Sequence, residues 1–369
     1  MIAQATGQGP ACPVPWYELN IMYNRRVGCC CYYNGYVLSW NNRQAADMFY
    51  YWNGAFISQI RSEVVRGVMD SGCSGCGFYR FKDDGAVYAT FDPPPESTPE
   101  QIANLQRARE NFNLGSVTVD HVPIRFYFNF GVGCNLNCIM CGQTSERPDE
   151  TSLDADLLWQ WLPHFKKSLC LSLIGGEPLV LPQALSFIRK VVSEKELEAV
   201  QLDLYTNGAV LDKHMDLLER KNRLSICVSL DGVGPTYERI RKGGNWARVE
   251  RNLLDFKETS VRKGLRWSLT TANLIMKTSL AGLERLVDWH IAQDITPNFS
   301  DFSLAPGIEK TFLEENVFEF PHLLAEVPDW THQFDASIQK LEGKGWWSVA
   351  AILRNMKLDL VHRLFKPFP

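Results

Sequence analysis

Residues 128–141 read Phe-Asn-Phe-Gly-Val-Gly-Cys-Asn-Leu-Asn-Cys-Ile-Met-Cys and follow directly on strand-forming residues that begin at Ile124. Cys134, Cys138 and Cys141 therefore lie on one loop after a predicted strand. Three thiolates at this spacing can bind three irons of a [4Fe–4S] cluster. The fourth iron then has no protein ligand, and such an open metal position is available for substrate chemistry. Zinc is disfavoured, because structural zinc takes four protein ligands and no His pair accompanies these cysteines.

The chain alternates strand-like and helix-like segments from here to about residue 305. Strand-like runs lie at residues 124–130, 169–174, 200–205, 224–230, 266–271 and about 295–302. Helical patterns separate them at residues 155–166, 182–193, 246–263 and 280–293. Alternation of this kind is typical of a parallel sheet, and six units are enough for an open or partial barrel. We therefore predict an α/β fold in which residues 122–305 form a partial (β/α)6 TIM-like barrel.

The cysteines are the first of four motifs, each at the end of a predicted strand. The others are Gly175-Gly176-Glu177-Pro178, Tyr205-Thr206-Asn207-Gly208 and Val228-Ser229-Leu230-Asp231-Gly232, the last followed by Arg241. Parallel barrels place their active sites at the carboxyl ends of their strands. Adjacent glycines allow a close ligand approach, and Glu177 suits an ammonium group. Asn207 and Ser229 suit ribose hydroxyls, and Arg241 suits a carboxylate. Singly, each of these residues is as readily part of a turn or a solvated surface, so the ordered set carries the prediction.

This ordered set resembles the radical S-adenosylmethionine (radical SAM) superfamily over about residues 122–300. The family hallmark is CxxxCxxC after the first barrel strand, followed by a GGEP motif after the second. The resemblance implies a [4Fe–4S] cluster with one open iron, bound by Cys134, Cys138 and Cys141. It also implies S-adenosylmethionine (SAM) as cofactor, with contacts from Met140, Gly175, Gly176, Glu177, Pro178, Asn207, Ser229, Asp231 and Arg241. Met140 stands where the family often has an aromatic residue, and its polarizable thioether suits the same place against adenine.

Six further cysteines lie within residues 1–90, a loop-rich stretch of the kind that usually draws order from a metal centre. Its Cys12-Pro-Val-Pro-Trp start, cysteine triple at 29–31, Trp52-Asn53-Gly54 stretch and closing Cys-x-x-Cys resemble the SPASM/Twitch auxiliary module, here placed before the barrel. The resemblance implies a second [4Fe–4S] cluster bound by Cys12, Cys30, Cys73 and Cys76. Cys29 and Cys31 remain alternatives to Cys30, and a zinc site remains the alternative to iron and sulfur. Cys170 and Cys227 lie inside strand patterns and are expected to be buried apolar residues.

Two further segments complete the predicted organisation. Residues 91–121 contain a proline-rich linker and a helix that starts at Thr98-Pro99-Glu100-Gln101, a capping-box sequence. Residues 306–369 form a mainly helical C-terminal extension. With the auxiliary module at 1–90 and the barrel at 122–305, the chain is expected to have four parts.

Composition narrows the classes of partner. The 369 residues carry 38 Lys and Arg against 42 Asp and Glu, with no basic stripe, so nucleic-acid binding is not expected. No apolar run approaches the roughly 18 residues of a membrane span, and the N-terminus lacks the pattern of a signal peptide. We therefore predict a cytoplasmic protein whose thiols stay reduced and which has no membrane partner. The remaining partners would be a reducing electron donor such as flavodoxin or ferredoxin, and a peptide or small-molecule substrate.

The resemblance also implies a reaction. Reductive cleavage of SAM gives methionine and a 5′-deoxyadenosyl radical, which abstracts hydrogen from a peptide or sugar-like substrate. Because an auxiliary cluster can accept the substrate electron, we predict an oxidoreductase that performs a net oxidation. One alternative is a redox-neutral epimerase with Cys29, Cys31 or Cys227 as hydrogen donor. Another is a non-catalytic metal-binding interaction module, which the intact motifs disfavour.

Overall fold

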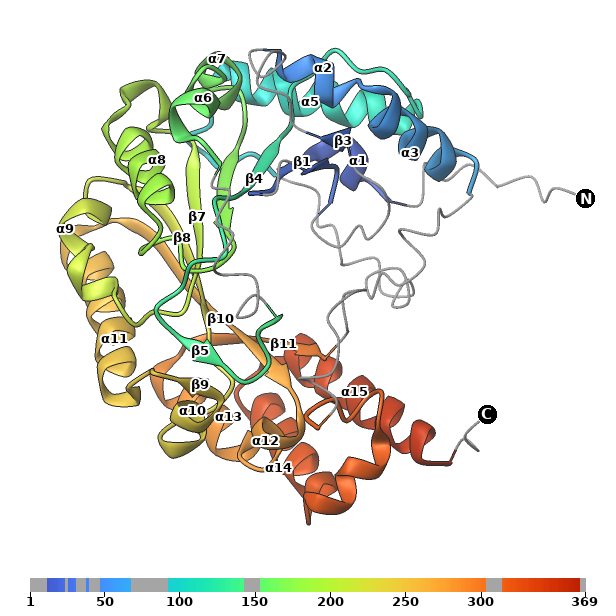
Figure 1. Ribbon diagram of the computed structural model, residues 1–369, viewed down its shortest axis with the longest axis vertical. Helices are drawn as coiled ribbons and strands as arrows, with labels where there is room; N and C mark the ends of the chain where they lie inside the picture. The colour runs from blue at the N-terminus through green and yellow to red at the C-terminus, as the bar shows by residue number, and fades with distance from the viewer. Residues whose placement is uncertain are drawn as a thin grey trace, which may run out of the picture. The chain divides into compact units, whose positions relative to one another are not determined.

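The computed structural model of the chain describes residues 12–23, 26–30, 38–39, 47–67, 92–142, 153–302 and 314–365. These residues belong to two compact units, whose elements are labelled in Figure 1. Unit 1 comprises residues 1–131 and 150–203, and unit 2 comprises residues 132–149 and 204–369. The chain passes between the units for the last time inside strand β7 (Gln201–Thr206). The boundaries predicted near residues 90 and 305 lie outside the described residues, and the boundary near residue 121 stays a prediction.

Unit 1 is built on a mixed sheet. Its strands, in spatial order, are β6 (Cys170–Ile174), β4 (Arg125–Asn129), β1 (Glu18–Ile21), β2 (Arg26–Gly28) and β3 (Leu38–Ser39). Strands β1 and β6 both run parallel to β4, whereas β2 is antiparallel to β1 and β3. The N-terminal stretch, predicted to be loop-rich, thus adds strands to the sheet that holds the first predicted barrel strand. The segment Glu-Leu-Asn-Ile alternates polar and apolar residues over four positions, the shortest run that indicates a half-buried strand, and this strand was not predicted.

Helices cover the apolar face of the unit 1 sheet. They are α1 (Val14–Tyr17), α2 (Met48–Trp52), α3 (Ala55–Val65), α5 (Pro99–Asn113), α6 (Ala155–Trp159), α7 (Leu162–Phe165), α8 (Pro182–Ser193) and the 3-10 turn η3 (Lys195–Leu197). Phe126 and Phe128 of β4 are fully buried, with ring centroids 5.1 Å from Phe165 and Phe187 respectively. Successive strand residues point to opposite faces, so Arg125 and Tyr127 lie on the other, polar face.

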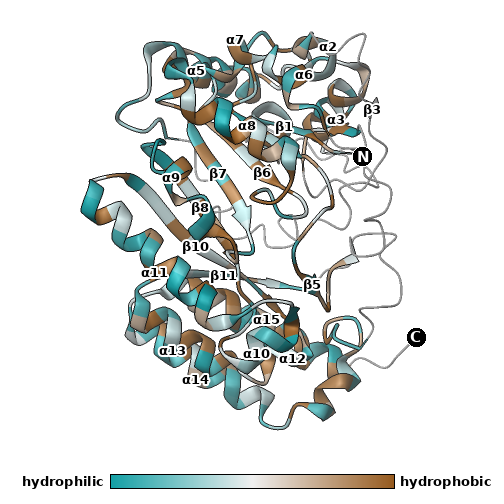
Figure 2. Cartoon of the chain, turned by 60° about the vertical axis from the view of Figure 1, so that its left-hand side comes forward, coloured by the Kyte–Doolittle hydropathy of each residue, from teal (hydrophilic) through white to brown (hydrophobic). Residues whose placement is uncertain are grey.

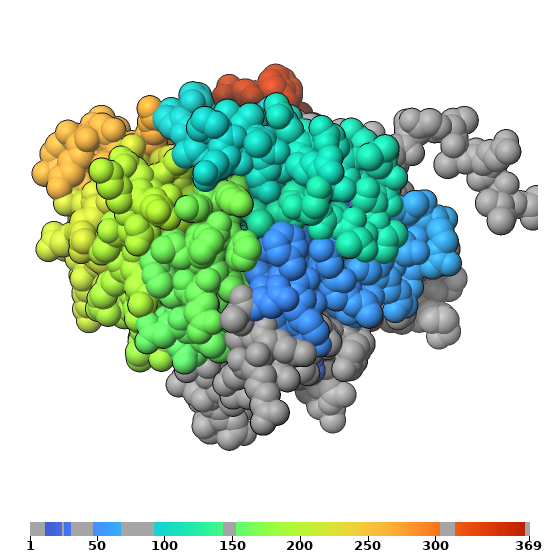
Figure 3. Space-filling view, turned by 90° about the horizontal axis from the view of Figure 1, so that it is seen from above, coloured from blue at the N-terminus to red at the C-terminus, as the bar shows by residue number. Residues whose placement is uncertain are grey.

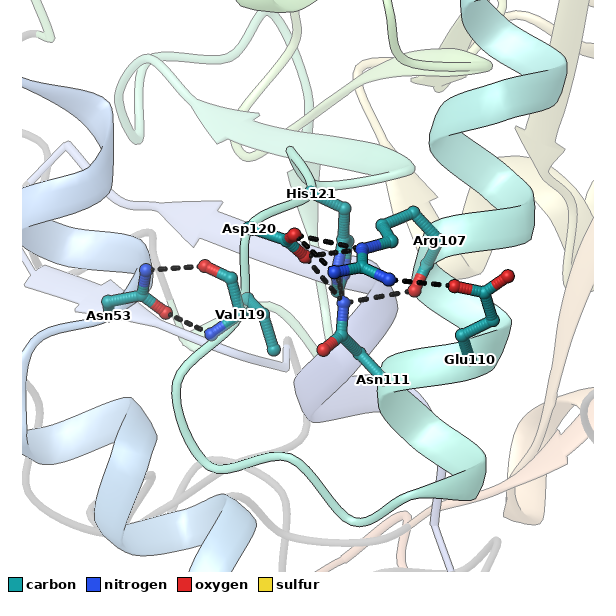
Figure 4. A network of polar contacts seen from close by, with 7 residues as sticks. All are labelled: Asn53, Arg107, Glu110, Asn111, Val119, Asp120 and His121. Atoms are coloured by element: carbon teal, nitrogen blue, oxygen red, sulfur yellow. Dashed lines mark hydrogen bonds and ion pairs between the residues drawn. The ribbon is translucent and has the colours of Figure 1, made fainter.

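Helix α5 begins with the predicted capping box, in which Thr98 Oγ1 accepts from Gln101 N at 3.2 Å and Gln101 Oε1 accepts from Thr98 N at 2.9 Å. A polar network then joins this helix to the segment that leads into β4 (Figure 4). The network includes Arg107 paired with Asp120 at 2.6 Å, and both side-chain polar atoms of Asn53 bonded to the Val119 backbone. Figure 3 shows the surfaces of residues near 100–120 and near 50–65 side by side within unit 1. The N-terminal helices of unit 1 are therefore held by side-chain-to-backbone bonds as well as by apolar packing.

Unit 2 contains a parallel sheet in the order β11 (Thr296–Asp301), β10 (Arg266–Ile275), β8 (Arg223–Ser229) and the end of β7. Strand β10 runs parallel to both β8 and β11. A separate two-stranded antiparallel sheet pairs β5 (Asn137–Cys138) with β9 (Arg241–Lys242). This small sheet fixes the cysteine loop of unit 2.

The helices of unit 2 include a C-terminal group. They are η4 (Leu211–Lys213), α9 (Met215–Leu218), α10 (Pro235–Ile240), α11 (Trp246–Lys263), α12 (Lys277–Leu280), α13 (Leu283–Gln293), η5 (Pro321–Glu326), α14 (Trp330–Gly343) and α15 (Trp347–Phe365). Helix α11 carries hydrophilic and hydrophobic residues along its length (Figure 2), and its Phe256 stacks on Trp267 of β10 at 4.4 Å. In the described part of the chain, no helix is both long and apolar enough to cross a membrane.

The predicted fold class is confirmed: the architecture is α/β with a mostly parallel sheet and a helical C-terminal part. The six strand-like runs correspond to β4, β6, β7, β8, β10 and β11, and the helical patterns at 182–193 and 246–263 are α8 and α11. The pattern at 155–166 is two short helices instead of one. Pro163 lies in the first turn of α7, and because proline has no backbone N–H to donate to the preceding turn, one continuous helix cannot pass through it.

Candidate active site

The cysteine loop of unit 2 is held by backbone pairing. In the small sheet Cys138 lies opposite Arg241, and Ile139 N donates to Ile240 O at 2.9 Å. Cys141 N donates to Cys138 O at 3.1 Å, and all three loop cysteines are half-buried. Burial raises the pKa of the Cys138 thiol, Arg241 opposes the rise, and Cys141 and Cys134 add to it. The structure thus brings the three predicted ligands into one electrostatic neighbourhood.

The three cysteines of this loop are the kind of donor set that binds a [4Fe–4S] cluster. Within the described ranges, no three His, Cys, Asp or Glu side chains are grouped closely enough to hold one metal ion. The thiolates of a cube bind different irons, so they stand further apart than the ligands of one ion.

Several N–H groups face the cysteine sulfurs. Cys134 Sγ accepts from Leu136 N at 3.4 Å and from Asn207 Nδ2 at 3.5 Å, and Arg241 Nη1 lies 3.6 Å from Cys138 Sγ. Hydrogen bonds to the sulfurs are among the features by which a protein tunes an iron–sulfur cluster. The loop therefore places N–H donors beside two of the cysteines that are predicted to bind the cluster.

Asn207 and Met140 also lie at this loop. Asn207 is buried at the end of β7, where its Nδ2 donates to Asn135 Oδ1 at 2.9 Å and its Oδ1 accepts from Ala209 N at 2.9 Å. This residue was predicted to contact ribose; the structure shows it tying β7 to the cysteine loop. Met140 is half-buried between the second and third cysteines.

Asp231 and Arg241 form a buried ion pair in unit 2. Asp231 Oδ2 lies 2.6 Å from Arg241 Nη2, and Asp231 Oδ1 accepts from Leu274 N of β10 at 2.8 Å. Burial raises the pKa of the Asp231 carboxyl, and Arg241 opposes that rise. Arg241 Nε is buried without a hydrogen-bond partner. Ser229, the remaining predicted contact in this unit, is the half-buried last residue of β8.

The Gly-Gly-Glu-Pro motif belongs to unit 1 and begins where β6 ends. Gly175 has φ +122°, and a Cβ built there would lie 2.3 Å from Asn129 Oδ1 and 2.8 Å from Gly131 O. Gly176 N donates to Gly131 O at 2.9 Å. The end of β4 therefore requires glycine at position 175. The sequence predicted that a ligand would come close to this glycine, and in the structure another part of the chain does so.

Glu177 and Pro178 complete the turn that starts at Gly175. Glu177 is fully buried, and its Oε1 accepts from Leu179 N at 3.1 Å. Pro178 is buried beside it. The turn is thus rigid, with its carboxylate enclosed by protein.

A buried charged cluster on the polar face of the unit 1 sheet was not predicted. Arg125 of β4 lies 3.5 Å from Glu18 of β1 and 3.7 Å from Asp203 of β7. Cys170 Sγ donates to Asp203 Oδ2 at 2.9 Å, so this cysteine is buried as expected but in polar surroundings. Burial raises the pKa of Glu18 to about 7, and Arg125 opposes the rise. The alternation in Arg-Phe-Tyr-Phe-Asn and in Glu-Leu-Asn-Ile was the available signal, since it places the charges on one face.

The predicted auxiliary ligands are only partly within the described residues. Cys12 and Cys30 are half-buried and Cys29 is buried, all in unit 1. Cys31, Cys73 and Cys76 lie outside the described residues. Of the predicted hydrogen donors, Cys227 is half-buried on β8, so the expectation that it is a buried apolar residue is only partly met.

A buried arginine lies in the same N-terminal region as Cys29. Arg61 of α3 is fully buried, donates to Pro15 O at 2.9 Å and Val117 O at 3.1 Å, and lies over the Trp52 ring at 4.4 Å. Burial lowers the pKa of Arg61 to about 9, and Cys29 opposes that shift.

Part of the chain matches a known protein family. Residues 128–285 match the model of the radical SAM superfamily. The match starts inside β4 and includes the cysteine loop, the Gly-Gly-Glu-Pro turn and the ends of β7 and β8. These residues therefore form a radical SAM domain, as the sequence motifs predicted.

Curated relatives are similar over parts of their length. A "Probable GTP 3′,8-cyclase" of Methanococcus aeolicus is 27% identical over 161 residues, which are 42% of this chain and 52% of that protein. A GTP 3′,8-cyclase of Synechocystis is 34% identical over 27% of this chain and 28% of the relative. The sporulation killing factor maturation protein SkfB of Bacillus subtilis is 27% identical over 34% of this chain and 30% of the relative. The chain thus spans about half or less of the length of these relatives.

Solved structures show more distant similarity. The SAM-bound structure of Streptococcus suis SuiB is 15% identical with a TM-score of 0.41, covering 81% of this chain and 64% of SuiB. The structure of anSMEcpe with bound AdoMet is 18% identical with a TM-score of 0.38, covering 48% of this chain and 51% of that protein.

Proposed function

We propose that this protein is a radical SAM oxidoreductase that abstracts hydrogen from a peptide or sugar-like substrate and completes a net oxidation. The observation that carries the proposal is the cysteine loop of unit 2, where three thiols lie on a paired backbone with N–H donors facing two of the sulfurs. The radical SAM match over residues 128–285 supports the same chemistry.

Cys134, Cys138 and Cys141 are proposed to hold a [4Fe–4S] cluster, which when reduced supplies the electron that cleaves SAM into methionine and a 5′-deoxyadenosyl radical. The residues proposed to bind and orient SAM are those expected from the sequence, namely Met140, Gly175, Gly176, Glu177, Pro178, Asn207, Ser229, Asp231 and Arg241. Of these, Glu177 offers a carboxylate to the SAM ammonium group, which suits a charge-assisted hydrogen bond. The contacts of Arg241 also favour a second role, at the sulfur of Cys138.

The proposed oxidation balances in two one-electron steps. The deoxyadenosyl radical takes a hydrogen atom from a substrate C–H bond and becomes 5′-deoxyadenosine. The substrate radical then loses one electron and one proton. The proposed electron acceptor is a second [4Fe–4S] cluster held by Cys12, Cys30, Cys73 and Cys76, and the external reductant is a flavodoxin or ferredoxin.

The substrate class is supported by one relative more than by the others. SkfB is named as a maturation protein of a killing factor, which favours a peptide, whereas the cyclases are named for a nucleotide. The net charge of −4 supports the absence of a nucleic-acid partner. A cytoplasmic location and the absence of a membrane partner remain part of the proposal.

A redox-neutral epimerase is the second candidate. Its hydrogen donor would be Cys227, because this residue is half-buried and stands two positions before Ser229 on β8, on the same face of the strand. Cys29 and Cys31 are weaker choices. Cys29 is buried in the same N-terminal region as Arg61, and Cys31 lies outside the described residues.

Anaerobic reconstitution tests the main proposal. Wild-type protein should bind about eight irons per chain, four per cluster, and should form 5′-deoxyadenosine from SAM with dithionite, as measured by chromatography. The Cys134→Ala/Cys138→Ala/Cys141→Ala variant should keep about four irons and form no 5′-deoxyadenosine. Cys170→Ser is the matched control, because Cys170 is a cysteine outside both predicted clusters. Deoxyadenosine formation by the triple variant, or its absence from iron-loaded wild type, contradicts the proposal.

A further inference from the structure

We infer that Arg241, held in place by Asp231, donates a hydrogen bond to the Cys138 thiolate of the SAM-cleaving cluster and thereby sets the reduction potential of that cluster. This inference rests on the proposed function, since it requires a cluster at Cys134, Cys138 and Cys141. It gives Arg241 a role at the sulfur ligands in addition to the SAM contact that the proposed function assigns to it.

The backbone places Arg241 at the cysteine. Strand β9 pairs with β5 so that Arg241 lies directly opposite Cys138. Residues opposite each other in an antiparallel pair project to the same side, which brings their side chains together. Arg241 Nη1 accordingly lies 3.6 Å from Cys138 Sγ. Lys242, the next residue of β9, is exposed and projects to the other side.

Asp231 fixes the orientation of the Arg241 guanidinium group. The ion pair of Arg241 Nη2 with Asp231 Oδ2 measures 2.6 Å, and the second carboxylate oxygen accepts from the Leu274 backbone at 2.8 Å. Because a guanidinium is a planar, rigid fork, anchoring one terminal nitrogen also determines where the other one points. Asp231 is therefore a positioning residue: it is bonded to the sheet and acts on the cluster through Arg241.

Structural stabilisation alone does not account for this pair. Both side chains are buried, at 1% and 9% exposure, and removing two charges from water can cost more than their attraction returns. The arrangement also leaves Arg241 Nε buried with no hydrogen-bond partner, which is a further cost. The arrangement that carries these costs fixes a cationic N–H group at a sulfur ligand.

The expected effect on the cluster has a definite sign. Adding an electron makes the cluster more negative, so a nearby positive charge and an N–H···S bond stabilise the reduced state and raise the reduction potential. Asp231 partly offsets that charge. Loss of Arg241 should lower the potential, whereas neutralising Asp231 should raise it, because the guanidinium then loses its counter-charge.

The test is an EPR-monitored redox titration of the anaerobically reconstituted 369-residue chain, carried out without SAM and then with SAM bound. The signal that disappears in the Cys134→Ala/Cys138→Ala/Cys141→Ala variant identifies the relevant cluster. Arg241→Gln should reduce the equilibrium constant for one-electron reduction about tenfold, a shift of about 59 mV to lower potential. Asp231→Asn should shift the potential in the opposite direction. Lys242→Gln removes the same unit of charge from the neighbouring residue and should change the potential much less.

Each outcome decides the inference. Equal potentials for Arg241→Gln and Lys242→Gln overturn it, as does a shift that appears only when SAM is bound, which would assign Arg241 to the SAM carboxylate. If Arg241→Gln fails to hold the cluster, Asp231→Asn decides, since an unchanged potential there overturns the inference and a raised potential supports it. Failure of wild-type protein to form any EPR-active cluster is a separate result that rejects the proposed function itself.

Discussion

Each unit has an arginine on a strand beside acidic side chains, but the two arrangements differ in burial and geometry. In unit 2, Arg241 contacts Asp231 at 2.6 Å. In unit 1, Arg125 stands between Glu18 and Asp203 at 3.5 Å and 3.7 Å, and about a quarter of its side chain is exposed. The short, enclosed pair fixes both charges in place. In the wider cluster, Glu18 can take up a proton and lose its negative charge while the cluster keeps its structure. The pair in unit 2 is suited to hold a side chain in position, and the cluster in unit 1 is suited to change its charge with pH.

The two arginines should therefore differ in what their loss costs. Arg241→Met leaves Asp231 enclosed with one backbone donor, and breaking a buried pair in this way should lower the free energy of unfolding by about 3–5 kcal/mol. Arg125→Met should cost roughly 1–3 kcal/mol, because Asp203 keeps its bonds to Gln201 and Cys170 and Glu18 can take up a proton. Urea unfolding of both variants followed by tryptophan fluorescence measures the difference. Equal costs would remove the distinction between the two clusters.

Glu18 gives the unit 1 cluster a pH dependence. Burial raises the pKa of the Glu18 carboxyl from its ordinary value near 4.5 to about 7, so the folded state binds the proton more tightly than the unfolded state. Stability from this group is thus complete below about pH 4.5 and declines as pH rises through 7, by up to about 3 kcal/mol. Glu18→Gln should lose that decline between pH 5 and 8. Unfolding free energies at a series of pH values test this, with Asp120→Asn, an exposed carboxylate of the same unit, as the control; parallel curves for Glu18→Gln and wild type would refute it.

Substitutions of the cysteines in the two units should also have separate effects on iron content and on SAM cleavage. Cys73→Ala/Cys76→Ala should remove about four irons and leave 5′-deoxyadenosine formation with dithionite nearly unchanged, because the cysteine loop belongs to unit 2. Iron analysis and chromatography of the same preparation give both values. A matched Cys170→Ser preparation should keep all the iron. Parallel loss of SAM cleavage and iron in the double variant would mean that the N-terminal cysteines support the whole fold instead of a separate cluster.

The sequence predicted the elements that depend on local patterns. Six strands, the capping box at Thr98 and Gln101, and the motifs after β4, β6, β7 and β8 all follow from periodicity, caps and spacing. The division at Pro163 was missed although proline was visible, because the flanking apolar pattern continued across it.

The interactions that the sequence did not predict depend on pairing between distant segments. The placement of β1 beside β4 joins segments more than 100 residues apart, so no local window contains it. Asp231 and Arg241 were identified as separate SAM contacts, and their mutual ion pair was not predicted. The contact of Arg241 with Cys138 follows from the register of the two-residue strands β5 and β9. Strands this short have no periodicity to recognise, and three-dimensional pairing alone determines their partners.

The pairing of β5 with β9 has a consequence for synthesis of the chain. Cys138 precedes Arg241 by 103 residues, and at translation rates of about 5–20 residues per second the second strand follows the first by about 5–20 seconds. During that interval the nascent loop exposes its thiols without the strand that later holds them. Oxidants and stray metal ions have access to the cysteines in that period, so assembly in the cell favours a reducing environment and cluster insertion after β9 has emerged from the ribosome.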